Sequence, residues 1–513
     1  MALTRTRVAL RRAWRGFQQS ILFFPILLVG ASLLLFTGTA LADRTFFQGF
    51  AGVRDLGVWQ FLVFGGSPVA AESLLSTIAS MWASITGVVF SVTLVALSLS
   101  ATKYSAQVVP YFERDRLVQV VLGVYLATVV YALLVLKTVR TGETGEEYLP
   151  FLGTNVAILL AVGSLFLLVL FIQNIASYIR PKRFVAGLAG DVRKNVEVLL
   201  VPARTAGYEV ARDNFPQAPP DSAPGWVHVR VREAGFLQAV DWEQLHGLLH
   251  DLLKREGAAV SPQGLGRYLK VHRRLGEHVG KGDAVVSLHA PGAAADQEAW
   301  DRLLLAFRLQ DTRTVEGDPG YGVESLADIS VTSMSGGTTD VGVALACVRE
   351  QFGIARLAVQ SPAPEARFKA QVGAVSLPVE RRVEPLLETV LRHVRRTHDK
   401  ALNEGYGEVL EEELMGLASL LEVCEREGAG DATARVLEWG GHLLDDVFSS
   451  LRDVETLERV TERFSRLLRD LQGTARERKV ASGLHARLRG AIAKHKDAAA
   501  AERLLRLLPV FPP

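Results

Sequence analysis

The pattern of hydrophobic and polar positions separates an apolar N-terminal region from a mixed remainder. A helix needs about 20 apolar residues to cross the hydrocarbon core of a membrane. Four uncharged stretches are long enough, at residues 20–42, 73–102, 117–136 and 148–179. They predict a four-helix transmembrane domain over residues 20–180, with spans at about 20–42, 74–102, 117–136 and 150–176.

Charged residues beside these stretches predict the orientation. Arginines crowd the segment 1–19, and further basic residues lie between spans two and three and after span four. The loop between spans three and four instead carries Glu143, Glu146 and Glu147. Because cytoplasmic loops carry the excess of lysine and arginine, we expect a multi-pass protein of the cell inner (plasma) membrane with both termini in the cytoplasm.

The first span has an alternative interpretation as a signal peptide. Ala40, Leu41 and Ala42 form an A-x-A pattern after a basic N-terminal region. The apolar segment is longer than the usual 7–15 residues of a signal peptide, which favours a retained span. Cleavage would leave three spans and the same cytoplasmic C-terminus.

The second span carries hydroxyl groups in two stripes with heptad spacing on nearly opposite faces of a helix. The first stripe comprises Ser84, Ser91 and Ser98, and the second comprises Thr86, Thr93 and Ser100. One interpretation is a hydroxyl-lined path for water or ions, with one such helix per subunit around an axis. The other is close helix packing, which small and hydroxylated residues favour in lipid.

The segment between spans two and three is expected to form a cytoplasmic joint. Pro110 should break the helix, and Asp115 can cap the third span. The joint is either a plain intracellular hairpin or a coupling elbow between the membrane and soluble domains. The candidate coupling residues are Tyr104, Ser105, Asp115, Arg116 and Gln119.

The pattern after the fourth span predicts a cytoplasmic α+β domain over residues 181–375. Strands are expected at 227–231 and in a strand–turn–strand unit at 268–288, which resembles the hairpins of small barrel-sandwich carrier domains. Lys281 does not lie in the tight turn that a carrier needs, so this unit is interpreted as scaffold. Helices are expected at 184–201, 241–256, 297–309, 325–334 and 341–352, with Asp241 and Asp340 as N-caps.

Residues 376–513 have helical periodicity almost throughout, which predicts a bundle or an array of helix pairs. Breaks are expected near Gly405, residues 427–431, Gly440–Gly441 and Gly473. The expected fold class is therefore a polytopic α-helical membrane domain with four spans, a cytoplasmic α+β domain and a C-terminal helical bundle.

Composition narrows the class of function. The 513-residue chain has a net charge of +2, so no basic field indicates a nucleic-acid partner. Cys347 and Cys424 are its two cysteines, which predict neither a disulfide framework nor a cysteine metal site and fit a reducing compartment. The predicted spans contain no Asp, Glu, Lys, Arg or His, which argues against ion-coupled transport.

Few motifs carry chemistry. His246 and His250 lie one helical turn apart, a spacing that can bind zinc, but two exposed imidazoles on an amphipathic helix are the simpler interpretation. The glycine-rich turn at 335–340 can cradle an anion, although Asp340 would repel a phosphate. The sequence has no P-loop, Rossmann fingerprint or nucleophile elbow, so no catalytic, cofactor or metal site is predicted.

Three groups of residues together have the spacing of a family signature. The first comprises Ser100, Tyr104, Ser105, Phe112, Asp115, Arg116, Gln119, Leu122, Gly123 and Tyr131; the second is the segment 234–241; the third comprises Arg313, Thr314, Asp318, Tyr321, Gly322, Leu326, Asp328, Ile329 and Ser335. Over about residues 15–360 the chain thereby resembles the predicted membrane proteins of domain of unknown function 2254, an uncharacterised bacterial family. The resemblance implies an integral membrane protein with a cytoplasmic domain and brings no established activity with it.

The chain departs from this family pattern at two places. The family tends to carry Ser-Pro-Arg where this chain has Ser105, Ala106 and Gln107, and it tends to carry an Asn-Asp-Pro segment where this chain has Thr338, Thr339, Asp340 and Val341. If these positions form the family's functional site, that site is altered in this chain.

The favoured hypothesis is an oligomeric channel-like protein of the inner membrane with a cytoplasmic regulatory domain. The alternative is a membrane-anchored scaffold or signalling module without a pore, and a membrane-associated enzyme is the weaker alternative. The expected partners are the lipid bilayer and further copies of the chain, with an ion or small regulatory ligand left open. An enzyme would require convergence in one pocket of the candidate residues Arg313, Asp318, Asp328, Ser335 and Asp340.

Overall fold

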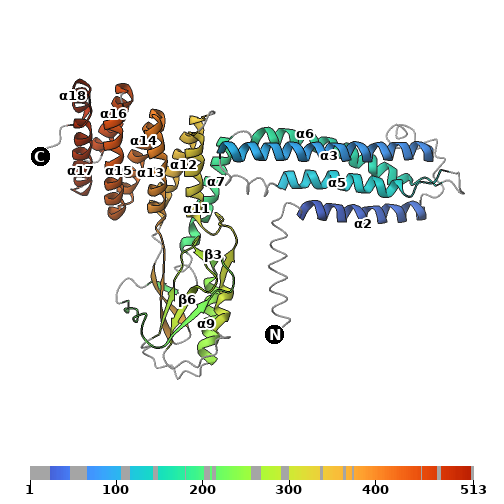
Figure 1. The fold of residues 1–513 in the computed structure, drawn as a ribbon, viewed down its shortest axis with the longest axis horizontal. Coiled ribbons are helices and arrows are strands. Elements are labelled where there is room, and N and C mark those ends of the chain that lie inside the picture. Colours follow the sequence, from blue (N-terminus) through green and yellow to red (C-terminus); the bar gives the residue numbers. More distant parts are fainter. Residues whose placement is uncertain are drawn as a thin grey trace. The chain divides into compact units, whose positions relative to one another are not determined.

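The computed structural model describes residues 23–46, 66–104, 116–141, 148–178, 181–200, 208–210, 215–255, 267–290, 300–335, 339–361, 366–372, 375–451, 453–470 and 475–509. The chain divides into two compact units, Met1–Pro181 and Lys182–Pro513 (Figure 1). Each unit has its own buried hydrophobic cluster, and neither cluster mixes residues of the two units.

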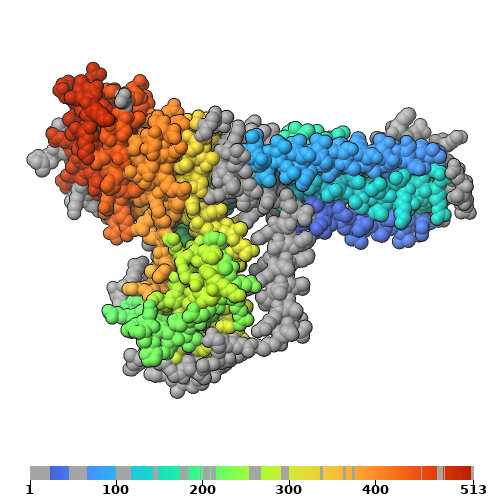
Figure 2. Space-filling view, viewed as in Figure 1, coloured from blue at the N-terminus to red at the C-terminus, as the bar shows by residue number. Residues whose placement is uncertain are grey.

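The N-terminal unit consists of long apolar helices. They are α2 (Phe23–Phe46), α3 (Pro68–Tyr104), α5 (Arg116–Leu136) and α6 (Phe151–Tyr178). Each is long and apolar enough to cross a membrane, which confirms the prediction of four membrane helices. The other three helices pack against α5, and Figure 2 shows α2, α3 and α5 side by side on one face of this unit.

The core of this unit combines aromatic packing with polar contacts between helices. The rings of Trp82 and Tyr125 lie 4.9 Å apart between α3 and α5. The hydroxyl groups of Thr39 and Tyr131 are 3.0 Å apart, which joins α2 to α5 by a hydrogen bond. In lipid such side-chain hydrogen bonds supply helix association that the hydrophobic effect cannot.

Asp43 corrects the prediction that the spans lack charged residues. The first span was predicted to end at Ala42, but α2 continues to Phe46 and the apolar segment reaches Thr45. The Asp43 side chain is buried and accepts hydrogen bonds from the backbone amides of Leu152 and Gly153, at 2.7 and 2.9 Å. A carboxylate of α2 therefore caps the N-terminus of α6.

The C-terminal unit begins with α7 (Pro181–Asn195) and the 3₁₀ helix η4 (Val196–Leu200). A six-stranded sheet follows in the order β1-β8-β9-β4-β6-β2, antiparallel except between β4 and β9, and a three-stranded sheet has the order β5-β3-β7. The strands are β1 (Tyr208–Val210), β2 (Trp226–Arg230), β3 (Gly235–Val240), β4 (Tyr268–Val271), β5 (His278–Val279), β6 (Ala284–His289), β7 (Phe307–Gln310), β8 (Arg367–Val372) and β9 (Val375–Arg381).

Helix α9 (Trp242–Arg255) covers the sheets (Figure 1). Leu245 and Leu249 on its apolar face are fully buried in the cluster formed by the strands. The carboxylate of Asp241 accepts a 2.9 Å hydrogen bond from the amide of Gln244, so the predicted N-cap is confirmed.

Two segments that were predicted to be helical contain strands. The described part of the helix expected at 297–309 is helical only up to Ala306, where the 3₁₀ helix η5 (Arg302–Ala306) leads directly into β7, which pairs with β3. The helical region expected from residue 376 onward begins later, because β8 and β9 form a hairpin whose second strand reaches Arg381. In both places, pairing with strands distant in sequence overrides the local periodicity.

Helices from both sides of the hairpin in sequence pack in succession (Figure 1). They are α11 (Pro319–Ser333), α12 (Val341–Gln360), α13 (Leu386–Glu404), α14 (Gly407–Arg426), α15 (Gly430–Ser450), α16 (Val454–Asp470), α17 (Ala475–Ala493) and α18 (Ala498–Leu507), of which α11 and α12 precede the hairpin in sequence. Helix α12 packs on α11 and α14, α14 on α15 and α16, and α18 on α16 and α17. This succession is an array of helices, and the predicted bundle is not confirmed.

The predicted helix breaks have different outcomes. Gly405 ends α13 with φ +79°, as expected for a left-handed C-cap. The break expected at Gly440–Gly441 is wrong, because both residues lie inside α15. A side chain at Gly440 would lie 2.7 Å from Leu417 of α14, so this glycine permits a close helix contact. Gly473 lies outside the described residues.

Candidate functional site

Helix α3 presents one of its two hydroxyl stripes on the surface of the N-terminal unit. Ser84, Ser91 and Ser98 are exposed, as are Thr77 and Ser80 on the same face. The opposite side of the helix is buried against the unit, with Leu75 and Trp82 fully enclosed. The first stripe therefore faces away from the chain's own helices.

The second stripe lies partly inside the unit. Thr86 and Thr93 are half-buried, and the side chain of Ser100 lies outside the described residues. The hydroxyl groups of Ser84, Thr86 and Thr93 donate to backbone carbonyls four residues earlier, at 2.6 to 2.9 Å. These three hydroxyls therefore use their donor hydrogens within the helix. The two stripes differ in exposure, since the first is exposed and the described residues of the second are half-buried.

The predicted joint falls mostly outside the described residues. Tyr104 is the last residue of α3 and Arg116 is the first of α5. Gln119 follows one turn later and is buried in the N-terminal unit. Ser105 and Asp115 lie outside the part of the chain that the structure describes, as do Ala106 and Gln107.

A cavity of about 270 Å³ lies in the C-terminal unit. Its walls come from the turn after β4, the start of α11, and the connection from β9 into α13. The arginines that line it are Arg273, Arg274, Arg313, Arg381, Arg382 and Arg392. The carboxylates that line it are Asp318, Glu324 and Glu384.

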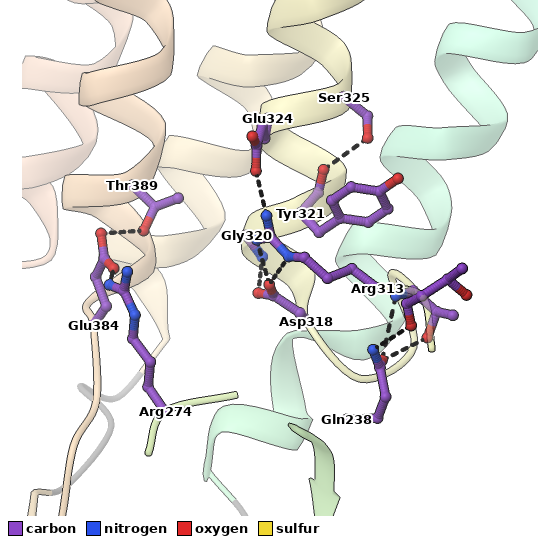
Figure 3. A network of polar contacts seen from close by, with 12 residues as sticks. Gln238, Arg274, Arg313, Asp318, Gly320, Tyr321, Glu324, Ser325, Glu384 and Thr389 are labelled. Atoms are coloured by element: carbon purple, nitrogen blue, oxygen red, sulfur yellow. Dashed lines mark hydrogen bonds and ion pairs between the residues drawn. The ribbon is translucent and has the colours of Figure 1, made fainter. Parts of the chain in front are cut away.

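Arg313 is the centre of a polar network on one wall of the cavity (Figure 3). Its guanidinium donates to Asp318 Oδ2 at 2.6 Å and to Glu324 Oε2 at 2.7 Å. It also lies 4.8 Å from the ring centroid of Tyr321, a cation–π distance. Burial lowers the pKa of Arg313, but the hydrogen bonds and charges of Asp318 and Glu324 more than offset it, so the pKa is raised. Arg313 is therefore a fixed positive charge.

The turn that contains Gly276 leaves room for the side chain of Asp318. Gly276 has φ +76°, and a Cβ atom built there would lie 1.8 Å from Asp318 Oδ2. Asp318 in turn caps α11 by accepting a 3.0 Å hydrogen bond from the amide of Gly320. The Asp318 carboxylate thus binds Arg313 and caps α11 at the same time. It fits there because Gly276, on the facing turn, has no side chain.

A second charged group lies at the rim of the cavity. Glu384 pairs with both Arg274 and Arg392, and its Oε1 accepts a 3.1 Å hydrogen bond from the hydroxyl of Thr389. Figure 3 shows Thr389 beside Glu384 near the start of α13, with Arg274 approaching Glu384 from another segment. Sequence reasoning missed this group, because Arg274 lies far along the chain from the segment that carries Glu384, Thr389 and Arg392, and the two segments share no motif.

The predicted pocket residues only partly come together. Arg313 and Asp318 line the cavity, whereas Asp328 pairs with Arg396 at 2.7 Å. Ser335 donates to the carbonyl of Val331, and Asp340 accepts from the amide of Val343 as the predicted N-cap of α12. The convergence that an enzyme would require of these residues is not found.

His246 and His250 do not form a metal site with their neighbours. His246 Nε2 lies 2.6 Å from the carbonyl oxygen of Gln371, and His250 lies 4.0 Å from Asp251. Within the described ranges, no group of three or more His, Cys, Asp or Glu side chains is placed to hold a metal ion.

The fold and the cavity together define a membrane protein with a large, separately packed α/β and helical unit. The sequence profile described as "Predicted membrane protein (DUF2254)" matches residues 18–403. The chain belongs to this family, and the resemblance stated from its motifs is confirmed.

Two curated relatives are similar to the chain. "Uncharacterized protein Rv1290c" of Mycobacterium tuberculosis (strain ATCC 25618 / H37Rv) is 23% identical over 304 residues, which are 59% of this chain and 55% of that protein. "Uncharacterized protein Mb1321c" of Mycobacterium bovis (strain ATCC BAA-935 / AF2122/97) has the same identity and coverage. The chain thus spans about half the length of the curated relatives it matches. No solved structure matches it.

Proposed function

We propose that the protein is a homo-oligomeric, channel-like protein of the inner membrane, in which copies of α3 surround a common axis. The observation that carries this proposal is the exposed hydroxyl stripe of α3. Polar groups on the lipid-facing surface of a membrane helix are disfavoured, whereas the same groups suit a subunit contact or a wetted path.

The shape of the stripe supports contact between copies. Gly87 lies between Ser84 and Ser91 on the same face, and open space surrounds its backbone. Large apolar side chains flank the stripe, with Val88 63% and Val95 67% exposed. A narrow row of small residues between bulky ones lets two helix backbones approach closely.

The proposed orientation places both termini and the C-terminal unit in the cytoplasm. The basic residues before α2 and after α6 support this assignment, because lysine and arginine accumulate on the cytoplasmic side. In this orientation the C-terminal unit is available to regulate the membrane unit in response to a cytoplasmic signal.

A specific observation favours a second candidate, a membrane-anchored scaffold or signalling module without a pore. Thr77 and Ser84 of the exposed stripe donate to carbonyls of their own helix. Hydroxyls bonded in this way need no water, so they are compatible with a dry contact between copies. Both candidates require the stripe to lie at a subunit interface, and they differ in whether water reaches it.

The test is a set of single cysteines on α3 in full-length protein in liposomes. Ser84→Cys and Ser91→Cys probe the stripe, and Phe90→Cys probes an exposed position away from it. The native Cys347 and Cys424 can stay, because both are buried and burial raises the pKa of both thiols, which suppresses their reaction. Disulfide cross-linking, labelling by a membrane-impermeant thiol reagent, and ion flux are then measured.

The channel proposal expects cross-linked oligomers, fast labelling at Ser84→Cys and Ser91→Cys, and flux that the label blocks. Cross-links without labelling or flux support the scaffold. The absence of cross-links through the stripe, with equal behaviour of Phe90→Cys, contradicts both candidates.

A further inference from the structure

The arginine-lined cavity of the C-terminal unit has an unbalanced charge. Six arginines and three carboxylates line it. Arg273 is bound by two carboxylates, those of Glu277 and Asp283, at 2.6 and 2.9 Å, which together more than balance its charge. With these two carboxylates counted, six arginines face five carboxylates, and the excess of positive charge is clearest at the rim, where the single carboxylate of Glu384 pairs with both Arg274 and Arg392.

The positive groups are arranged as a fixed inner wall and an accessible rim. Arg313 is held by two carboxylates, and Arg381 is buried with its guanidinium donating to the carbonyl of Leu199 at 2.7 Å. Arg274 and Arg392 stand at the rim with 49% and 56% of their side chains exposed. Donors that are already positioned lose little entropy when an anion binds.

Glu384 is the group that an incoming anion would compete with. One carboxylate serves both Arg274 and Arg392, although each guanidinium can form a bidentate pair of its own. Each rim arginine therefore keeps donors for a second oxyanion, and an anion between them would relieve the shortage of negative charge.

We propose that this cavity binds a small phosphate monoester, with the phosphate group between Arg274 and Arg392 and the organic part toward the apolar wall at Leu275 and Leu386. A phosphate monoester carries about 1.5 to 2 negative charges near pH 7 and presents three acceptor oxygens, so it can bridge the two rim guanidiniums, whereas a monocarboxylate presents two oxygens. The volume of about 270 Å³ lies just below the usual range of ligand pockets, which favours a ligand of the size of a sugar phosphate.

This inference is independent of the proposed channel, because it concerns residues of the C-terminal unit alone. It holds equally if α3 packs in a dry scaffold. A phosphate ester also occurs as a lipid headgroup, so the source of the ligand is an outcome of the test.

The experiment measures the binding of glycerol 3-phosphate to full-length protein in phosphatidylcholine nanodiscs by titration calorimetry, with glycerol as the uncharged control. We expect a Kd between about 10 µM and 1 mM that increases as salt is added.

A second set of measurements uses nanodiscs that contain phosphatidic acid. Loss of glycerol 3-phosphate binding there identifies a lipid headgroup as the ligand, and unchanged binding identifies a free ester.

Variants of the rim residues are expected either to weaken or to tighten the binding of glycerol 3-phosphate. Arg274→Gln and Arg392→Gln should each weaken binding about tenfold, because each removes a charge-assisted contact. Glu384→Gln should tighten binding several-fold, a result that a folding defect cannot produce. Arg349→Gln is the matched control, since Arg349 forms a similar exposed pair with Glu412 at 2.7 Å outside the cavity. No binding by the wild type, or weaker binding by Glu384→Gln, would overturn the proposal.

Discussion

Gly276 is the residue at which the wall of the cavity has no room for a side chain. It has φ +76°, and a Cβ atom there would overlap the carboxylate of Asp318. Gly276→Ala should therefore displace Asp318 and lower the free energy of unfolding by about 3 kcal/mol or more, from backbone strain and steric overlap together. Denaturant unfolding of the purified protein measures this change.

The control for this prediction is Gly282→Ala. Gly282 has φ +90° but open space around it, so alanine there meets only the backbone strain, about 1–2 kcal/mol. Equal losses at the two positions would show that the contact with Asp318 does not matter.

His272 makes the stability of the C-terminal unit depend on pH. Burial, with Lys270 and His228 nearby, lowers its pKa to about 4 from the ordinary value of 6.5. The unfolded chain therefore takes up a proton below about pH 6.5 that the folded chain does not, and stability falls as the pH falls from there toward 4. We expect this group alone to cost on the order of 1–2 kcal/mol between pH 7 and pH 5.

The measurement is denaturant unfolding at pH 7 and pH 5. His272→Gln should lose less stability than the wild type between these values, because its side chain takes up no proton in either state. His250→Gln, at an exposed position, should follow the wild type. Parallel pH dependence of His272→Gln and the wild type would refute the assignment.

The sequence predicted the candidate site only in part, and the reason lies in how its residues are spaced. Arg313 and Asp318 are five positions apart and belong to one motif, so the sequence could predict that they lie close together. Arg274, Glu384 and Arg392 meet across more than 100 positions, and nothing in their local sequence marks them. Charged residues of this kind are most often solvated surface, and only the fold shows that these enclose a cavity.

At the scale of elements, the contact between α2 and α6 depends on a single carboxylate. Asp43 accepts hydrogen bonds from two backbone amides at the start of α6. Asp43→Ala should lower the free energy of unfolding in detergent by about 2–3 kcal/mol, because two amides lose a charged acceptor in a buried place. Asp43→Asn keeps one acceptor oxygen and should lose about half as much. Equal stability of Asp43→Ala and the wild type would contradict the cap.

The array of C-terminal helices depends on where glycine permits contact. Gly440→Ala places a methyl group 2.7 Å from Leu417 Cδ2 and should cost about 1–2 kcal/mol. Gly483→Ala in α17 meets open space and should instead stabilise by about 0.5–1 kcal/mol, because alanine has the better helix propensity. Urea unfolding of the two variants should give opposite signs, and the same sign would refute this interpretation.

The elements differ in how well the sequence specifies them. Apolar length alone identified α2, α3, α5 and α6, because lipid leaves few alternatives to a helix. Phe307–Leu309 was expected to be helical, and β7, which contains it, depends on pairing with β3, about 70 positions earlier. The glycines of α15 were expected to break a helix, and only the neighbouring helices show why they do not.

At the scale of the whole molecule, the two units are separate in their packing. The buried cluster of the N-terminal unit contains residues of α3, α5 and α6, and that of the C-terminal unit contains residues of the strands and α9. A fragment comprising residues 182–513 should therefore fold without the membrane unit and unfold in a cooperative transition, measured by circular dichroism during heating.

The point at which this fragment begins matters, because α7 belongs to the fold of the C-terminal unit. Val192 of α7 is fully buried, and its side chain lies where a Cβ atom of Gly322 would be. The carbonyl of Leu199 also accepts the hydrogen bond from Arg381 at the cavity. A fragment comprising residues 201–513 should therefore be less stable by several kcal/mol, since it exposes the apolar surface that Val192 covers and leaves Arg381 without this acceptor. Equal stability of the two fragments would mean that α7 only connects the units, and an unfolded longer fragment would mean that the C-terminal unit depends on the N-terminal unit for its folding.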